Sequence, residues 1–138
     1  MKNKTGRRII VGVTGASGSV YAKMTIEKLL ASDEVAEVAL IYSRVGREVV
    51  EYELGDLPLF DDPRVREFAG SDAFAAPASG SAGYDSMVIV SCSMGTAGRI
   101  ASGVASDLLC RAAGVMLQAR RLLLLVSRER PPSPLHPR

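Results

Sequence analysis

The chain has 138 residues, of which 47% are hydrophobic and 23% are charged, and its formal net charge is +2, as in one ordinary globular domain that buries a core. Its 17 basic residues are scattered among 15 acidic ones, which argues against a nucleic-acid-binding surface. No apolar run approaches the roughly 20 residues that cross a bilayer, and no signal-type apolar segment follows residues 1–8, so we expect a cytoplasmic protein without nucleic acid or a membrane as partner.

The predicted elements alternate between strands and helices. In chain order the pattern predicts a strand at residues 8–13, a helix at 18–31, a strand at 38–42, a helix at 45–54, a strand at 86–91, one or two helices over 95–117 and a last strand at 122–126. Prolines interrupt residues 55–78, where we expect a loop with one short helix near residues 64–68. Apolar strands separated by helices are typical of a parallel sheet covered on both faces, which predicts a three-layer α/β fold. We expect a single domain over residues 1–129 and a proline-rich tail at 130–138.

A glycine-rich turn follows the first predicted strand. Gly12, Gly15 and Gly18 are spaced G-x-x-G-x-x-G, which matches neither the dinucleotide fingerprint nor the P-loop. A turn without bulky side chains still brings backbone N–H groups close to an anion, and the following helix adds its positive N-terminal end. The turn therefore favours a phosphate site, with close packing of strand against helix as the alternative.

Two further polar stretches follow predicted strands. Residues 91–99 (SCSMGTAGR) offer small and hydroxyl-bearing side chains that suit the edge of a planar heterocycle, although Ser93 also suits the N-cap of a helix. Residues 127–129 add an arginine and a glutamate, which are otherwise a solvated pair on a loop. The carboxyl ends of parallel strands meet at one edge of the sheet, so we expect all three stretches to form a shared ligand site there.

Other kinds of site are disfavoured. Cys92 and Cys110 form no C-x-x-C pair, and His136 is the single histidine, so we expect reduced thiols and no metal centre. A short-chain dehydrogenase can also begin with T-G-A-S-G, but no tyrosine here has a lysine four residues later. A nicotinamide-dependent oxidoreductase of that class is therefore disfavoured.

Four stretches, in matching order and with nearly matching spacing, resemble the UbiX flavin prenyltransferases: GVTGASGSVYA, PASGS, MVIVSCSMGTAGRIASGVASDLLCRAAGVML and RRLLLLVSRE. The resemblance implies a Rossmann-like or flavodoxin-like domain that binds FMN between the subunits of a homo-oligomer, a trimer commonly assembled into a dodecamer. It also implies transfer of a dimethylallyl group from dimethylallyl phosphate to reduced FMN. The prenylated FMN then serves a UbiD-type decarboxylase.

The resemblance also assigns roles to individual residues. It implies that Gly15, Ala16 and Ser17 contact the phosphate end of FMN and that Ser93, Met94, Gly95 and Thr96 contact its ribityl and ring portions. It also implies FMN contacts for Ser43 and Arg128. Catalytic roles fall to Glu129, Glu53 and Arg111. Two of these have structural alternatives, since Glu53 also suits an exposed helix carboxylate and Arg111 an ion-pair partner of Asp107 one helical turn earlier.

The chain departs from the family pattern in two places. Gln118 stands where the family has a lysine expected to neutralise the substrate phosphate, and a neutral amide supplies no charge. After Glu129 the family continues with elements that carry further phosphate ligands, where this sequence has a proline-rich tail that does not form a helix, so we expect a C-terminally truncated member. These departures keep open an alternative, an FMN-binding but catalytically impaired homologue. An FMN-dependent cysteine decarboxylase is less favoured, because His136 in the tail is a poor catalytic histidine.

Overall fold

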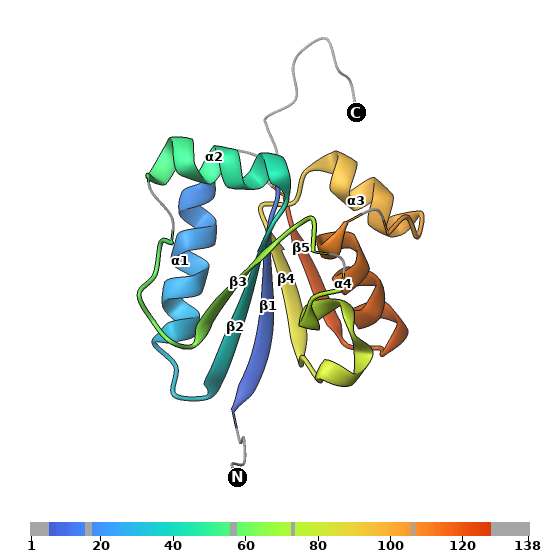
Figure 1. Cartoon of the computed structure of the whole chain (residues 1–138), viewed down its shortest axis with the longest axis horizontal. Helices are drawn as coiled ribbons and strands as arrows, with labels where there is room; N and C mark the ends of the chain where they lie inside the picture. The colour runs from blue at the N-terminus through green and yellow to red at the C-terminus, as the bar shows by residue number, and fades with distance from the viewer. Residues whose placement is uncertain (1–5, 16–17, 56–57, 73, 106, 128–138) are drawn as a thin grey trace.

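The computed structural model describes residues 6–15, 18–55, 58–72, 74–105 and 107–127. They include five strands: β1 (Arg7–Val13), β2 (Val35–Tyr42), β3 (Val65–Ala69), β4 (Ser86–Val90) and β5 (Leu122–Val126). All neighbouring strands pair in parallel, in the order β3-β2-β1-β4-β5 (Figure 1). This is the strand order of the doubly wound Rossmann sheet, so the predicted fold class is confirmed.

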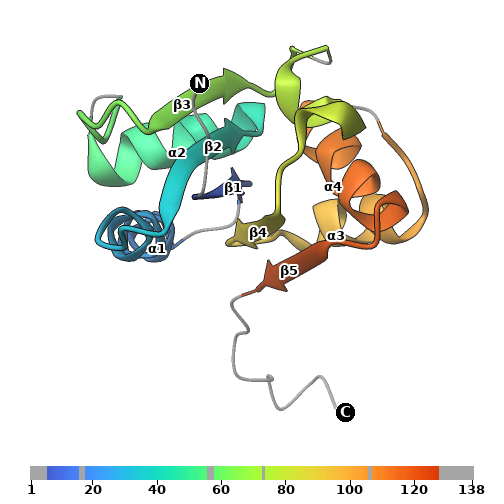
Figure 2. The ribbon, with the colours of Figure 1, turned by 90° about the horizontal axis from the view of Figure 1, so that it is seen from below.

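Helices cover both faces of the sheet. They are α1 (Ser19–Leu30), α2 (Arg44–Leu54), α3 (Met94–Ala101) and α4 (Leu108–Gln118), with short 3-10 turns at Ala76–Ala78 and Gly80–Ala82. Figure 2 shows α1 and α2 on one side of the sheet and α3 and α4 on the other. The predicted three layers are therefore present. None of the helices in the described ranges is long and apolar enough to cross a membrane.

The alternation of side chains along β1 divides the core between the two faces. Val11 and Val13 pack with Ile26 of α1, whereas Ile10 packs with residues of α4. A Cβ at Gly12 would lie 3.1 Å from Leu109 Cδ1, so this glycine permits the close approach of α4 to the sheet.

One expected element was wrong. The short helix predicted near residues 64–68 is instead the edge strand β3, which pairs along β2 with Leu40 opposite Glu67. Arginine, glutamate and alanine favour a helix locally, but pairing with a neighbouring strand overrides this preference. The other elements occur as predicted, although β2 begins at Val35, and the residues of 95–117 divide between two helices.

Three helices begin with a side-chain cap at the carboxyl edge of the sheet. Ser43 accepts a hydrogen bond from the Gly46 amide at 2.9 Å at the start of α2. Ser93 accepts from the Thr96 amide at 3.1 Å at the start of α3, which confirms that Ser93 is an N-cap. Asp107 caps α4. These caps direct the N-terminal ends of the helices toward one edge.

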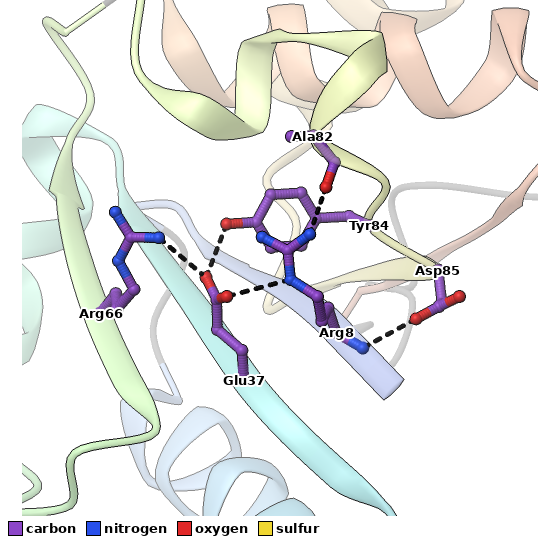
Figure 3. Close-up of polar contacts among 6 residues, drawn as sticks. All are labelled: Arg8, Glu37, Arg66, Ala82, Tyr84 and Asp85. Carbon is purple, nitrogen blue, oxygen red and sulfur yellow. Dashed lines mark hydrogen bonds and ion pairs between the residues drawn. The ribbon is translucent and has the colours of Figure 1, made fainter. Parts of the chain in front are cut away.

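A polar cluster ties the strands together at the opposite edge (Figure 3). The carboxylate of Glu37 accepts hydrogen bonds from Arg8 Nε at 3.0 Å and from the Tyr84 hydroxyl at 2.6 Å. Arg66 pairs with the same carboxylate at 3.4 Å, and the Arg8 guanidinium lies 4.3 Å from the centre of the Tyr84 ring. The cluster joins β1, β2 and β3 to the segment before β4, far from the glycine-rich turn.

Candidate functional site

The ends of β1 and β4 are joined by one buried side chain. The hydroxyl of Thr14, which follows β1, donates to the Ser91 carbonyl oxygen at 2.7 Å and accepts from the Ser93 amide at 2.9 Å. The two residues that it contacts follow β4. From β1 the chain builds the sheet outward through β2 and β3 on one side, and then through β4 and β5 on the other. Ligands of such sheets bind in the crevice beyond the carboxyl ends of β1 and β4, where this direction reverses. Thr14 therefore fixes the spacing of the loops that border the crevice.

A cavity of about 410 Å³ lies at this edge, and we call it the edge cavity. Its lining includes Gly15, Ser43, Val45, Ser93, Thr96 and Arg99. Gly15, Ser43, Ser93 and Thr96 are predicted FMN contacts that come from three separate parts of the sequence. The fold therefore brings together residues that the sequence assigned to one site.

Hydroxyl groups and a cation converge on the edge cavity. The Ser93 and Thr96 hydroxyl oxygens are 2.9 Å apart, and an Arg99 guanidinium nitrogen donates to the Thr96 hydroxyl at 3.2 Å. The Nε atom of Arg99 is buried and has no hydrogen-bond partner within the described part of the chain. Together with the N-terminal ends of α2 and α3, these groups suit an anion such as a phosphate.

The wall of the edge cavity requires a glycine at position 15. A Cβ built on Gly15 would lie 2.6 Å from Val45 Cγ1, closer than real Cβ atoms approach other atoms. The glycine-rich turn thus packs tightly against α2, as the packing alternative proposed, and also leaves its backbone bare at the cavity. The packing alternative is confirmed at this residue, and the phosphate site stays a prediction.

Other predicted residues lie away from the edge cavity. Met94 and Gly95 are exposed at the start of α3. Arg111 is exposed and lines a different cavity of about 420 Å³, together with Gln118. Glu53 is exposed near the end of α2, as its structural alternative proposed, and its Oε1 accepts a hydrogen bond from the amide that begins α1 at 2.9 Å.

Several predicted residues lie outside the described part of the chain. They are Ala16, Ser17, Arg128, Glu129 and His136.

Sequence reasoning missed four residues that line the edge cavity: Arg44, Val45, Arg99 and Asp107. Arg99 stands one helical turn after Thr96, and this spacing was the signal that would have placed both on one side of α3. Asp107 had been considered only as a partner of Arg111. Its carboxylate instead accepts the Cys110 amide at 2.9 Å, and no ion pair joins it to Arg111 among the described residues.

Comparisons with known proteins identify relatives over nearly the whole chain. The profile of the flavoprotein family matches residues 1–135. Flavin prenyltransferase UbiX of Thermoplasma acidophilum is 40% identical over 125 residues, which cover 90% of this chain and 67% of that protein. Flavin prenyltransferase LpdB of Lactiplantibacillus plantarum is 42% identical over 134 residues, covering 94% of this chain and 70% of that protein.

Solved structures agree with the sequence matches. The crystal structure of AnUbiX (PadA1) in complex with FMN and dimethylallyl pyrophosphate matches with a TM-score of 0.78 at 37% identity, covering 95% of this chain and 69% of that one. A dodecameric FMN-dependent UbiX-like decarboxylase from Escherichia coli O157:H7 matches with a TM-score of 0.80 at 34% identity, covering 94% and 70%. The FMN-dependent cysteine decarboxylase TvaF shares the fold alone, at 16% identity and a TM-score of 0.64 over 91% of this chain and 75% of that one.

Proposed function

Because this chain belongs to the UbiX family of flavoproteins, we propose that it is a flavin prenyltransferase, which transfers a dimethylallyl group from dimethylallyl phosphate to reduced FMN. The product serves a UbiD-type decarboxylase. The observation that carries the proposal is the edge cavity, because Gly15, Ser43, Ser93 and Thr96 meet there. We assign the FMN-binding role to the domain of residues 1–129.

The residues of the edge cavity fit the phosphate end of FMN. Gly15 presents no side chain to the cavity, since a Cβ there would collide with Val45, and the buried Nε of Arg99 is a donor without a partner among the described residues. Gly15 and Ser43 would hold the phosphate, with Ser93 and Thr96 toward the ribityl portion and Arg99 supplying positive charge. Reduced FMN supplies the electron-rich N5 and C6 atoms to which the dimethylallyl group is attached.

The chain's own residues prepare this site in two ways. The hydroxyls of Ser93 and Thr96 are fixed by the start of α3, so they stabilise bound charge without reorganising. The hydrogen bond from Thr14 to Ser91 holds the two loops that border the edge cavity in place. We further assign FMN contacts to Ala16, Ser17, Met94, Gly95 and Arg128, and catalytic roles to Glu53, Arg111 and Glu129, from their match to the family motif.

A homo-oligomer accounts for the position of Arg111. Arg111 lines the cavity on the outer side of α4 and is absent from the lining of the edge cavity. If FMN binds between subunits, the Arg111 of a second copy faces the FMN of the first. We propose a trimer or dodecamer on this basis, and one solved relative is described as dodecameric.

The alternative is an FMN-binding homologue with impaired catalysis. The observation that favours it is Gln118, which lies with Arg111 in the cavity on α4 and offers no charge to a substrate phosphate. Loss of one charge contact in a desolvated site lowers the rate by roughly a hundredfold.

One experiment separates the two functions. The full chain is incubated anaerobically with FMN, dithionite and dimethylallyl phosphate, and the released flavin is analysed by mass spectrometry. Prenylated FMN is the result expected for the prenyltransferase. Unmodified FMN that stays bound to the protein supports the impaired homologue, and a chain that binds no FMN contradicts both functions.

A further inference from the structure

A second cavity, of about 450 Å³, adjoins the edge cavity at the carboxyl ends of β2 and β3. We call it the α2 cavity, because Arg44, Arg47, Glu48 and Glu51 line it from one face of α2, across from Ser71. The two cavities share Ser43, Arg44 and Asp107 in their linings. The function proposed above uses the edge cavity and the cavity on α4, so the α2 cavity has no assigned ligand.

The α2 cavity contains a buried donor that lacks an acceptor. Tyr42, the last residue of β2, lines the cavity and is 3% exposed, and its hydroxyl has no hydrogen-bond partner in the described ranges. Burial, reinforced by the charge of Glu67, raises the pKa of Tyr42, so the hydroxyl stays protonated at neutral pH. Buried polar groups in folded proteins are normally paired, so this hydroxyl has the position of a ligand contact.

The charged groups around Tyr42 narrow the class of ligand. Arg44 forms no ion pair among the described residues, and a free guanidinium at the start of a helix suits a phosphate. Glu48 and Glu51 are acceptors, which suit the hydroxyls of a sugar. A phosphorylated ribose combines both requirements.

The position of the cavity in the sheet specifies the ligand further. Sheets with the order 3-2-1-4-5 place the adenosine ribose of a dinucleotide at the carboxyl end of the second strand, where an arginine accommodates a 2′-phosphate. Arg44 follows this strand end by two residues.

We propose that the α2 cavity binds the 2′-phosphorylated adenosine half of a nicotinamide dinucleotide such as NADPH. Arg44 binds the 2′-phosphate, Glu48 and Glu51 accept from ribose hydroxyls, and the Tyr42 hydroxyl donates to an oxygen of the ligand. Tyr42, Glu48 and Glu51 distinguish this site from the edge cavity, which they do not line, whereas Arg44 lines both cavities.

The test is calorimetric titration of the full chain, without FMN, using adenosine 2′,5′-bisphosphate as the probe. We expect Arg44→Gln to weaken binding at least about tenfold and Tyr42→Phe about fivefold, as loss of a charged and a neutral hydrogen bond implies. Tyr52→Phe is the matched control, since it makes the same change on α2 at a side chain that is 91% exposed. Arg7→Gln is the control for loss of charge, at the opposite edge of the sheet. Neither control should change the affinity.

Further outcomes decide between ligand sources. The proposal would be overturned if adenosine alone, or ribose 5-phosphate, bound as tightly as the bisphosphate. It would also be overturned if the unmodified chain did not bind the bisphosphate, or if Tyr42→Phe and Tyr52→Phe bound it with equal affinity. If Tyr42→Phe fails to fold, Glu48→Gln replaces it, because Glu48 is a proposed acceptor on the exposed face of α2, and about threefold weaker binding is expected. Thr96→Val separates the sites, because Thr96 lines the edge cavity and not the α2 cavity. Unchanged affinity for the bisphosphate is expected, and weaker binding would place the probe in the edge cavity and contradict the proposal.

Discussion

The hydroxyl of Thr14 donates to the carbonyl oxygen of Ser91 at 2.7 Å, and this one bond joins the ends of β1 and β4. Thr14 is 1% exposed, and the same hydroxyl accepts the amide of Ser93 at 2.9 Å. Both loops that border the edge cavity therefore depend on one buried side chain.

Replacing Thr14 by valine keeps the shape of the side chain and removes both hydrogen bonds. We expect Thr14→Val to lower the free energy of unfolding by about 1–3 kcal/mol and to weaken FMN binding about tenfold. Urea denaturation and FMN fluorescence titration measure the two effects. The control is Thr25→Val, because Thr25 donates to the Tyr21 carbonyl on the exposed side of α1. Equal results for the two variants would show that the tie does not order the site.

Two buried tyrosines predict opposite responses to one substitution. The Tyr84 hydroxyl donates to Glu37 at 2.6 Å, whereas the Tyr42 hydroxyl has no partner among the described residues. We expect Tyr84→Phe to lower the free energy of unfolding by about 1–3 kcal/mol and Tyr42→Phe to leave it unchanged or raise it. Chemical denaturation of both variants measures this difference, and a larger loss for Tyr42→Phe would mean that its hydroxyl is satisfied in the folded chain.

The cluster around Glu37 predicts a dependence of stability on pH. Burial alone would raise the pKa of Glu37, but hydrogen bonds from Tyr84 and Arg8 and the charges of Arg8 and Arg66 outweigh it, so the pKa lies below its usual 4.5. A carboxyl group with a lowered pKa stabilises the fold above its unfolded-state pKa, and this contribution is lost as the pH falls through the folded-state pKa.

Replacing Glu37 by glutamine tests this dependence. We expect Glu37→Gln to be less stable than the unmodified chain by about 2 kcal/mol at neutral pH, with the difference shrinking as the pH falls below about 4.5. Urea denaturation across this range measures the difference. Glu27→Gln removes an exposed carboxylate paired with Lys23 and serves as the control, with a change within about 0.5 kcal/mol at every pH. A Glu37→Gln difference that stays constant with pH would refute the role of the charge.

We predict a gain of activity when Gln118 is replaced by lysine. If the missing cation limits phosphate departure, Gln118→Lys should raise turnover, by up to about a hundredfold, since one charge contact in a desolvated site contributes on the order of 2–3 kcal/mol. Turnover is measured as the rate of formation of prenylated FMN. Gln118→Met has similar length and no charge, and it should give no gain. If both variants behave alike, the charge at this position does not limit the reaction.

Much of the fold follows from local sequence patterns. The strands at the centre of the sheet are continuous apolar runs, and the helices after Ser43 and Ser93 begin where hydroxyl residues suit a cap. The strand β3 could not be predicted from such patterns, because it is an edge strand that includes Arg66 and Glu67, is only partly buried and shows no clear apolar pattern. Pairing with β2 decides its structure, and single-sequence periodicity does not contain that information.

The candidate site was predictable where residues follow the ends of strands. Gly15, Ser43 and Ser93 each stand just after a strand, and parallel strands bring such positions to one edge. Arg99 and Tyr42 were missed for different reasons. Arg99 reaches the edge cavity because it lies one helical turn after Thr96 on α3. Tyr42 was treated only as the last residue of an apolar strand, because nothing in the sequence shows that its hydroxyl has no partner. The cytoplasmic location stays a prediction.

The central claim is that FMN lies with its phosphate against the glycine-rich turn at the edge cavity. The most direct test is the amount of FMN that stays with the protein after desalting, compared between Gly15→Val and Gly98→Ala. A side chain at Gly15 would collide with Val45, whereas a Cβ at Gly98 meets no atom within 4 Å. We predict that the unmodified chain and Gly98→Ala retain FMN and that Gly15→Val, although folded, loses it. A folded Gly15→Val variant with a full complement of FMN would contradict the claim.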